Sequence, residues 1–294
     1  MTTAFFDKTR TLLEMIKFSH TVFAFPFALM GAILASLVSG ASPSVGQLFW
    51  ICVAMIGARS AAMGFNRIID AKIDAGNPRT ASRHIPAGKV SRAEAWLFVG
   101  VSTALLLWAA WMLNPLCFVL APVALGLFVL YAFCKRFTSL AHVVLGVCLA
   151  GAPIGAWIAL RGDLQWPVVA LGLAVLFWVA GFDIFYALQD VDYDREEGLH
   201  SIPARLGVAR AILVGKVFHG VMVVLLALLP LGVPLGWIYY LGLFVVCCLI
   251  AYEHRLVKPG DLSKLDAAFF NMNGWISVTI FLFTLVDALV LGTR

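Results

Sequence analysis

The sequence predicts an all-α integral membrane protein, built as a bundle of nine transmembrane helices. Hydrophobic residues make up 62% of the 294 residues, charged residues only 13%, and the mean hydropathy is +0.95. Soluble globular domains are closer to half apolar and a quarter charged. These figures exclude an ordinary soluble enzyme, a disordered chain and a secreted disulfide scaffold. The remaining class is a chain that crosses a membrane repeatedly.

Nine apolar runs of about 18–25 residues are each long enough to cross a bilayer as a helix. They lie near 20–40, 48–69, 94–113, 115–134, 140–161, 166–190, 208–231, 234–253 and 266–292. An eight-helix bundle is the alternative, because the junctions at Asn114-Pro115 and from Pro230 to Pro234 are tight. Residues 1–20 have apolar residues at helical spacing, which predicts an interfacial helix. The whole chain, 1–294, is predicted to form a single transmembrane domain.

Basic residues are concentrated before the first span and at every second junction after it. These segments hold 16 of the 21 lysines and arginines, namely Lys8, Arg10, Lys17, Lys72, Arg79, Arg83, Lys89, Arg92, Lys135, Arg136, Arg195, Arg205, Arg210, Arg255, Lys258 and Lys264. Loops rich in lysine and arginine stay in the cytoplasm. We therefore expect a cytoplasmic N-terminus and a C-terminus outside. The net charge of +5 is explained by topology and requires no nucleic-acid partner.

The second predicted span ends in a cluster of polar residues. Ionisable groups at membrane depth are costly unless they face a cavity and find partners, so they mark candidate functional sites. Asn66, Asp70 and Asp74 are spaced at i, i+4 and i+8 and cover an arc of about 80° on a helix. The cluster therefore forms one acidic stripe.

The sixth predicted span ends in a second acidic stripe. Asp183, Asp190 and Asp194 fall within an arc of about 40°, with Tyr186 about 60° to one side. Asn66, Asp70 and Asp74 have the same spacing as Tyr186, Asp190 and Asp194, which lie 120 residues later. Ile-Pro-Ala also occurs twice, at 85–87 and 202–204. This weak internal repeat is typical of membrane sites that lie between two halves of a bundle.

Basic residues accompany the acidic stripes: Arg79, Arg83 and Lys89 lie in the loop between the second and third spans, and Lys135 and Arg136 follow the fourth span. Two acidic stripes that converge repel each other, and Mg²⁺ relieves such repulsion because it bridges a few carboxylates to substrate phosphates. Guanidinium and ammonium groups bind phosphate oxygens. The combination predicts a pocket for a diphosphate. The alternative is a set of loop charges that solvate each other at the membrane surface.

The motifs resemble those of one known family. N-R-I-I-D-A-K-I-D at 66–74, followed by N-P-R-T-A-S-R-H-I-P-A-G at 77–88, resembles the first motif of the UbiA superfamily of intramembrane aromatic prenyltransferases. D-I-F-Y-A-L-Q-D-V-D-Y-D-R-E-E-G-L-H-S at 183–201 resembles the second. K-F-S-H-T-V-F-A-F-P-F-A-L at 17–29 is similar to the family's first span. The resemblance covers nearly the whole chain.

The resemblance implies nine helices around a central cavity with cytoplasmic caps, expected in a bacterial inner membrane. It implies transfer of a polyprenyl group from an allylic diphosphate to an acceptor, with Mg²⁺ as cofactor. It also implies three groups of site residues: metal ligands, residues that bind the diphosphate, and catalytic residues in the cavity. The metal ligands are Asn66, Asp70, Asp74, Asp190 and Asp194, and the diphosphate-binding residues are Arg79, Arg83 and Lys135. Asp183 and Tyr186 match positions of the second motif that line the same cavity. We also expect Arg136, Asn66 and Tyr186 to bind substrate, and Asp183, Tyr186 and Asp190 to act in catalysis.

Within the superfamily the chain resembles the 4-hydroxybenzoate polyprenyltransferase branch. F-N-R-I-I-D, the Q-D-V-D-Y-D run and A-A-F-F-N-M-N-G at 267–274 resemble a subgroup of futalosine-route menaquinone synthesis, whose acceptor is a dihydroxynaphthoate. Both acceptors are aromatic hydroxy acids, and Arg59 either binds the acceptor carboxylate or pairs with a neighbouring helix. One departure is Arg83-His84, where many relatives have Arg-Pro, and it leaves His84 without a role.

Two other classes of membrane protein compete with this interpretation. A cation-coupled transporter also buries carboxylates, but near the bilayer midplane on broken helices. A CDP-alcohol phosphotransferase concentrates its acids in one run, whereas this chain divides them between two. His142 and His219 are interpreted as packed histidines, and Asp287 as a polar residue with a partner inside the protein.

Overall fold

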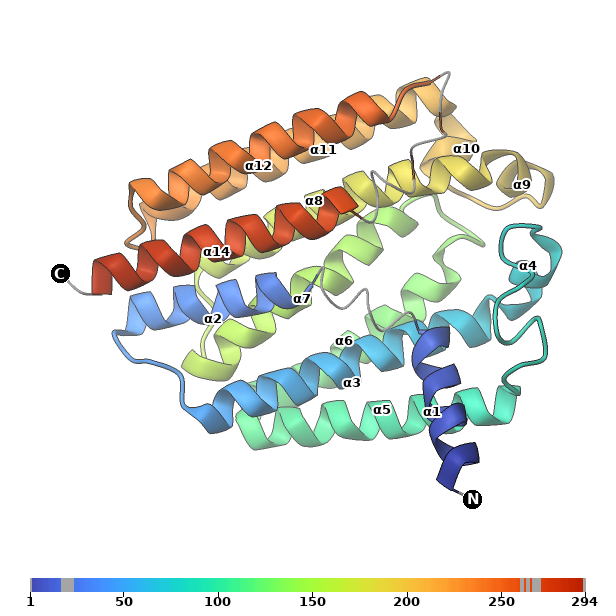
Figure 1. The fold of residues 1–294 in the computed structure, drawn as a ribbon, viewed down its shortest axis with the longest axis horizontal. Helices are drawn as coiled ribbons and strands as arrows, with labels where there is room; N and C mark the ends of the chain where they lie inside the picture. The colour runs from blue at the N-terminus through green and yellow to red at the C-terminus, as the bar shows by residue number, and fades with distance from the viewer. Residues whose placement is uncertain (1, 17–23, 260–261, 263–264, 266–270, 293–294) are drawn as a thin grey trace. The chain divides into compact units, whose positions relative to one another are not determined.

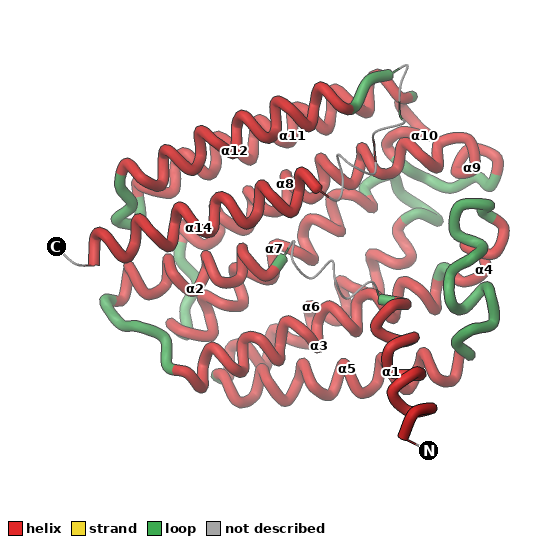
Figure 2. Tube along the Cα trace, viewed as in Figure 1, coloured by secondary structure: helices red, strands yellow, loops and turns green. Residues whose placement is uncertain are grey.

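The computed structural model describes residues 2–16, 24–259, 262, 265 and 271–292, whose regular structure is helical (Figures 1 and 2). Short helices and turns connect the long ones. The elements are α1 (Thr2–Met15), α2 (Phe25–Ser39), α3 (Val45–Ile69), α4 (Ala71–Gly76), α5 (Arg92–Leu113), α6 (Pro115–Cys134), α7 (Ala141–Arg161), α8 (Trp166–Ala187), η2 (Leu188–Asp190), α9 (Val191–Glu196), α10 (Ile202–Leu206), α11 (Val208–Leu228), η3 (Leu229–Leu231), α12 (Trp237–Leu256) and α14 (Asn273–Gly292).

Eight helices in the described residues are long and apolar enough to cross a membrane. They are α3, α5, α6, α7, the run from α8 through α9, α11 with η3, α12 and α14. The first predicted span corresponds to α2, whose 15 residues are apolar but fewer, and residues 20–23 of that span lie outside the described part. The prediction of an all-α membrane bundle is confirmed, and the count of nine agrees roughly when α2 is included.

The chain forms two compact units. The first comprises Met1–Thr21 and Leu48–Phe133, and the second comprises Val22–Gln47 and Cys134–Arg294. In the first unit α3 packs closely against α5. A Cβ atom at Gly57 would lie only 2.8 Å from the backbone nitrogen of Leu106, so this crossing requires glycine.

In the second unit α8 is the central helix. It packs against α7 on one side and α11 on the other, and α2 in turn packs against α7. Gly146 of α7 allows the closest approach, because a Cβ atom there would collide with the backbone carbonyl of Leu176 on α8. Small residues of this kind let membrane helices approach without a hydrophobic driving force. The helix that carries the second acidic motif is thereby fixed on both sides.

We expect Gly146→Ala to destabilise the second unit. The added methyl meets backbone, which cannot move aside like a side chain, and overpacking of this kind costs about 1–3 kcal/mol. Gly151→Ala is the matched control, because it lies on the same helix and a Cβ atom there meets nothing within 4 Å. Thermal unfolding of the purified variants should give a lower midpoint for Gly146→Ala than for Gly151→Ala. Equal midpoints would contradict the close packing.

The last described helix, α14, provides a hydrogen-bond acceptor for the N-terminus of α12. Asp287 of α14 is 2% exposed, and its carboxylate accepts a 2.5 Å hydrogen bond from the backbone N–H of Gly236. Gly236 is the residue that caps the N-terminus of α12, where backbone N–H groups lack partners within the helix. Asp287 is thus a polar residue with an internal partner, as predicted.

Candidate active site

The first acidic motif lies where α3 meets α4. Asp70 is the N-terminal cap of α4, yet the backbone bonds Asp70 N to Asn66 O (2.9 Å) and Asp74 N to Asp70 O (2.8 Å) continue the helical pattern. The side-chain amide of Asn66 donates to Asp70 Oδ2 at 2.9 Å. Asp70 and Asp74 are both buried. The predicted stripe therefore persists although the helix bends at Asp70.

Two arginines surround the Asp74 carboxylate. Arg83 Nη1 lies 2.6 Å from Oδ1, and Arg67 Nη1 lies 4.0 Å from Oδ2. Arg67 is itself buried, and its Nε donates to the carbonyl of Met15 at the end of α1. This arrangement holds the loop that carries Arg83 against the acidic motif and ties it to the N-terminal helix.

The loop after α4 is ordered by its own polar contacts. The Thr80 hydroxyl donates to the carbonyl of Asp74 at 3.1 Å, and the backbone N–H of Arg79 donates to Asn77 Oδ1 at 2.9 Å. Partial burial and the neighbouring Lys89 lower the pKa of His84 below its usual value. Both effects favour the neutral form of His84.

Arg59 lies on α3 about two turns before Asn66. Its Nε atom is buried, and no described residue forms a hydrogen bond or ion pair with the side chain. The residue as a whole is half-buried, and a guanidinium nitrogen buried without a partner is costly. Of the two interpretations of this arginine, pairing with a neighbouring helix finds no support among the described residues.

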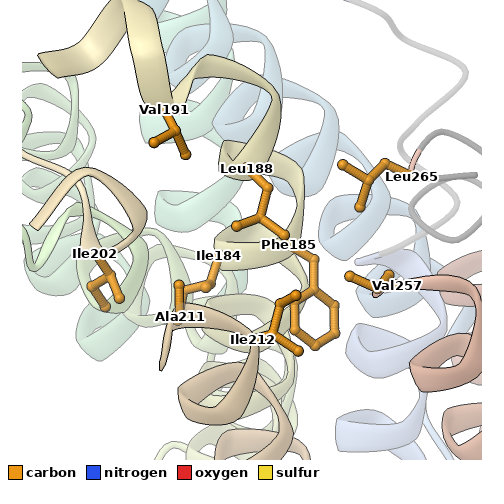
Figure 3. Packing of buried hydrophobic residues seen from close by; sticks show 9 residues of the cluster. All are labelled: Ile184, Phe185, Leu188, Val191, Ile202, Ala211, Ile212, Val257 and Leu265. Atoms are coloured by element: carbon orange, nitrogen blue, oxygen red, sulfur yellow. The ribbon is translucent and has the colours of Figure 1, made fainter. Parts of the chain in front are cut away.

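The second acidic motif follows the end of α8. The α-helix tightens to the 3-10 turn η2 at Leu188–Asp190 and then continues as α9. Asp190 and Asp194 are buried, whereas Asp192 is exposed. Figure 3 shows Ile184, Leu188 and Val191 packed with residues of α10 and α11. This apolar face fixes the rotation of the run and so the direction of its acids.

Lys135 lies in the same unit as the second motif. It interacts electrostatically with Asp194, and the Ser201 side chain hydrogen-bonds to that carboxylate. The backbone N–H of His200 donates to the Lys135 carbonyl at 2.7 Å, which ties the segment after α9 to the segment before α7. Lys135 and Arg136 are both half-buried. Lys135, predicted to bind the diphosphate, thus interacts with an acid of the second motif.

Asp183 and Tyr186 precede η2 on α8, and both are half-buried. Asp183 Oδ2 lies 2.7 Å from Nδ1 of His142, which is near the start of α7. The His142 ring is buried, and its Nε2 accepts a 3.4 Å hydrogen bond from the backbone N–H of Ile202. A buried histidine therefore connects the second motif to α10.

The oxygen atoms of the two acidic motifs fit a divalent cation. No three Asp, Glu, His or Cys side chains of the described residues form a metal cluster. Mg²⁺ needs only one or two carboxylates when substrate phosphates and water complete its shell. Asp74 Oδ2 and Asp194 Oδ2 are buried and have no hydrogen-bond partner among the described residues, and an unsatisfied buried oxygen is costly. All the donors are oxygens, so the residues fit Mg²⁺.

Comparison with known proteins decides the family. The model of the UbiA prenyltransferase family matches residues 24–276. The chain belongs to the UbiA prenyltransferase family. It is therefore a prenyltransferase and an integral membrane protein, as the resemblance of the two motifs predicts.

Curated relatives of this UbiA-family chain include 4-hydroxybenzoate octaprenyltransferases. The one from Pseudomonas aeruginosa strain UCBPP-PA14 is 31% identical over 245 residues, which cover 83% of this chain and 82% of the relative. The one from Vibrio campbellii is 31% identical over 241 residues, which cover 81% of this chain and 83% of the relative.

Solved UbiA homologs share the fold. The apo structure of a homolog from Aeropyrum pernix K1 has a TM-score of 0.82 and 32% identity, covering 92% of this chain and 98% of that one. A homolog from Archaeoglobus fulgidus bound to GPP and Mg²⁺ has a TM-score of 0.65 and 19% identity. The match covers 95% of this chain and 99% of that one. At 19% identity the second likeness shows the fold alone.

Two residues of this UbiA-family protein were missed by the sequence analysis. Arg67 is seven residues before Asp74, so the two lie within about 20° on a helix, and this spacing could have revealed their pairing. His142 carries no such local signal. Its partner Asp183 is 41 residues away on another helix, and only the packing of α7 on α8 brings them together.

Proposed function

We propose that this protein transfers a polyprenyl group from an allylic polyprenyl diphosphate to a ring carbon of an aromatic hydroxy acid. The observation that carries the proposal is the pair of buried acidic motifs in a chain 31% identical to 4-hydroxybenzoate octaprenyltransferases. 4-Hydroxybenzoate in quinone biosynthesis is the first candidate acceptor. 1,4-Dihydroxy-6-naphthoate for menaquinone is the alternative. A cation-coupled transporter has no support from the family or the curated relatives.

The acidic motifs are assigned to the metal and the basic residues to the diphosphate. Asn66, Asp70 and Asp74 hold one Mg²⁺, and Asp190 and Asp194 hold another. When bound, Mg²⁺ supplies positive charge where the leaving diphosphate develops negative charge. The diphosphate oxygens are assigned to Arg79, Arg83, Lys135 and Arg136. Arg83 is already held in place by Asp74, which reduces the entropy that binding costs.

The reaction separates charge. The allylic C–O bond breaks, its electron pair goes to the diphosphate, and the prenyl carbon becomes positive. The basic residues stabilise the diphosphate by fixed electrostatics. The face of an aromatic ring attracts a cation, and we assign this role to Tyr186. The apolar helices exclude water, which would otherwise capture the cation.

Asp183 is assigned as the base for the acceptor. The phenol O–H bond breaks, the proton goes to the carboxylate, and the electron pair stays on the phenolate oxygen. The ring carbon then forms the new C–C bond with the prenyl carbon. When aromaticity returns, the proton on that ring carbon leaves to the diphosphate or solvent, and Asp183 returns its proton to the oxygen. Atoms and charge balance over the cycle.

The acceptor carboxylate is assigned to Arg59, which has no counter-ion among the described residues. We expect Arg59→Gln to raise the KM for the aromatic acid about 10- to 100-fold, since a charged hydrogen bond contributes about 1.5–3 kcal/mol. The KM for the prenyl diphosphate should stay within about twofold. Steady-state kinetics with each substrate varied in turn measures both constants. If only the KM for the prenyl diphosphate rose, Arg59 would bind the prenyl diphosphate and not the aromatic acid.

The direct test of the function is an assay of prenyl transfer. Membranes containing the protein are given labelled polyprenyl diphosphate with either 4-hydroxybenzoate or 1,4-dihydroxy-6-naphthoate, with and without Mg²⁺. We expect a prenylated aromatic acid with 4-hydroxybenzoate. Product with only the naphthoate would establish the alternative acceptor. No product with either acid, under conditions where a 4-hydroxybenzoate octaprenyltransferase is active, would overturn the proposal.

We propose a cytoplasmic N-terminus and an outside C-terminus, in a bacterial inner membrane, from the distribution of basic residues. A reporter enzyme that is active only in the cytoplasm should be inactive when fused after Arg294 and active when fused before Met1. The reverse pattern would contradict this orientation.

A further inference from the structure

The pair formed by His142 and Asp183 joins α7 to the second acidic stripe. The two side chains lie 2.7 Å apart, and their exposed fractions are 2% and 18%. His142 is Asp183's only hydrogen-bond partner among the described residues. One carboxylate oxygen is therefore held by the imidazole, and the other is left for a ligand.

The second contact of His142 determines its tautomer. The backbone N–H of Ile202 can only donate, so His142 Nε2 must be the acceptor. In a neutral imidazole the other nitrogen then carries the proton. His142 Nδ1–H consequently donates to Asp183 Oδ2. Both ring nitrogens have partners, so the ring cannot rotate without losing a buried hydrogen bond.

We propose that His142 is a positioning residue for Asp183 in prenyl transfer. This inference rests on the proposed function, in which Asp183 takes the phenol proton. The imidazole binds Oδ2 and so directs Oδ1 toward the acceptor hydroxyl. The same ring is fixed by Ile202 at the start of α10, the short helix that follows the second acidic motif. His142 thus links the orientation of the base to the segment that carries Asp190 and Asp194.

A purely structural role for His142 makes a different prediction. If the ring only anchored α10 through Ile202, its loss would disturb the enzyme whether or not position 183 carried a base. If it acts through Asp183, its loss has no further effect once Asp183 is replaced. Ser139→Ala provides a matched control, because it removes the 3.5 Å bond from Arg205 of α10 without touching Asp183.

The test uses His142→Leu, His142→Asn, His142→Gln and Asp183→Asn in the full-length protein. We expect His142→Leu to lower kcat about 10- to 100-fold with little change in the KM for prenyl diphosphate, the scale of a misplaced catalytic group. At least one of the two amide variants, which retain an N–H donor, should stay within about fivefold of the wild type. Ser139→Ala should stay within about twofold.

The double variant gives the decisive comparison. Adding His142→Leu to Asp183→Asn should change the residual rate by less than about twofold. A further loss comparable to that of His142→Leu alone would overturn the proposal, as would wild-type activity of His142→Leu. If the wild type itself makes no prenylated product in the assay above, the proposed function fails instead, and the two failures are distinguishable.

A spectroscopic readout tests the hydrogen bonds without turnover. ¹⁵N NMR of histidine-labelled protein distinguishes protonated from unprotonated ring nitrogens, and His142→Asn identifies the signals of His142. We expect a protonated Nδ1 and an unprotonated Nε2 near neutral pH. The opposite tautomer, or protonation of both nitrogens, would overturn the assignment.

Discussion

Replacing Asp190 with Asn lowers the rate of prenyl transfer at least about a hundredfold, whereas Asp192→Asn stays within about threefold of the wild type. Asp190 is buried in the second acidic motif and is assigned to Mg²⁺, so the change weakens a ligand where charge develops. Removing one such electrostatic group costs about 10²–10³ in rate. Asp192 is exposed two residues away, and a solvated surface carboxylate contributes little.

The comparison requires single-turnover rates from variants present at equal levels in the membrane. Both substitutions replace a carboxylate with an amide of nearly the same size. The two variants therefore differ only in which carboxylate is lost. Equal large losses would mean that the run through α9 rotates during the reaction. Equal small losses would remove Asp190 from the metal site.

Removing divalent cations should abolish prenyl transfer. In the part of the chain that the structure describes, Asp74 Oδ2 and Asp194 Oδ2 are buried without a hydrogen-bond partner, and the diphosphate brings further negative charge. Excess EDTA should lower the rate at least about a hundredfold, because a metal contributes several kcal/mol to the stabilisation of such charge. Adding Mg²⁺ back should restore the rate.

EDTA saturated with Mg²⁺ beforehand controls for effects of the chelator itself. Asp190→Asn should also need more Mg²⁺ for half its maximal rate than Asp192→Asn does. Full activity in excess EDTA would contradict the metal assignment, and it would leave the basic residues as the sole stabilisers of the diphosphate.

Helical periodicity predicts the second acidic motif well. Asp190 and Asp194 are buried and Asp192 is exposed, as the spacing requires. The 3-10 turn η2 is not predictable in the same way, since no proline or glycine marks it. Leu188 and Val191, on either side of the turn's end, belong to a buried apolar cluster with residues of α10 and α11, and contacts of this kind between distant segments carry no local sequence signal.

Contacts between helices limit what the sequence reveals about the site. His142 is buried, as its interpretation as a packed histidine requires, but its bond to Asp183 depends on how α7 lies on α8. The same holds for Arg83, whose pairing with Asp74 depends on the path of the loop between them. The single domain, the central cavity and the roles of the site residues stay predictions.

The contact between Asp287 and Gly236 has a consequence for biogenesis. Asp287 is near the end of the last described helix, whereas Gly236 begins α12, which leaves the ribosome about fifty residues earlier. Until α14 is synthesised and inserted, the N-terminal cap of α12 lacks this acceptor. The cap of α12 is therefore completed only when α14 is in place. A chain that stops before Asp287 leaves the Gly236 N–H without this carboxylate.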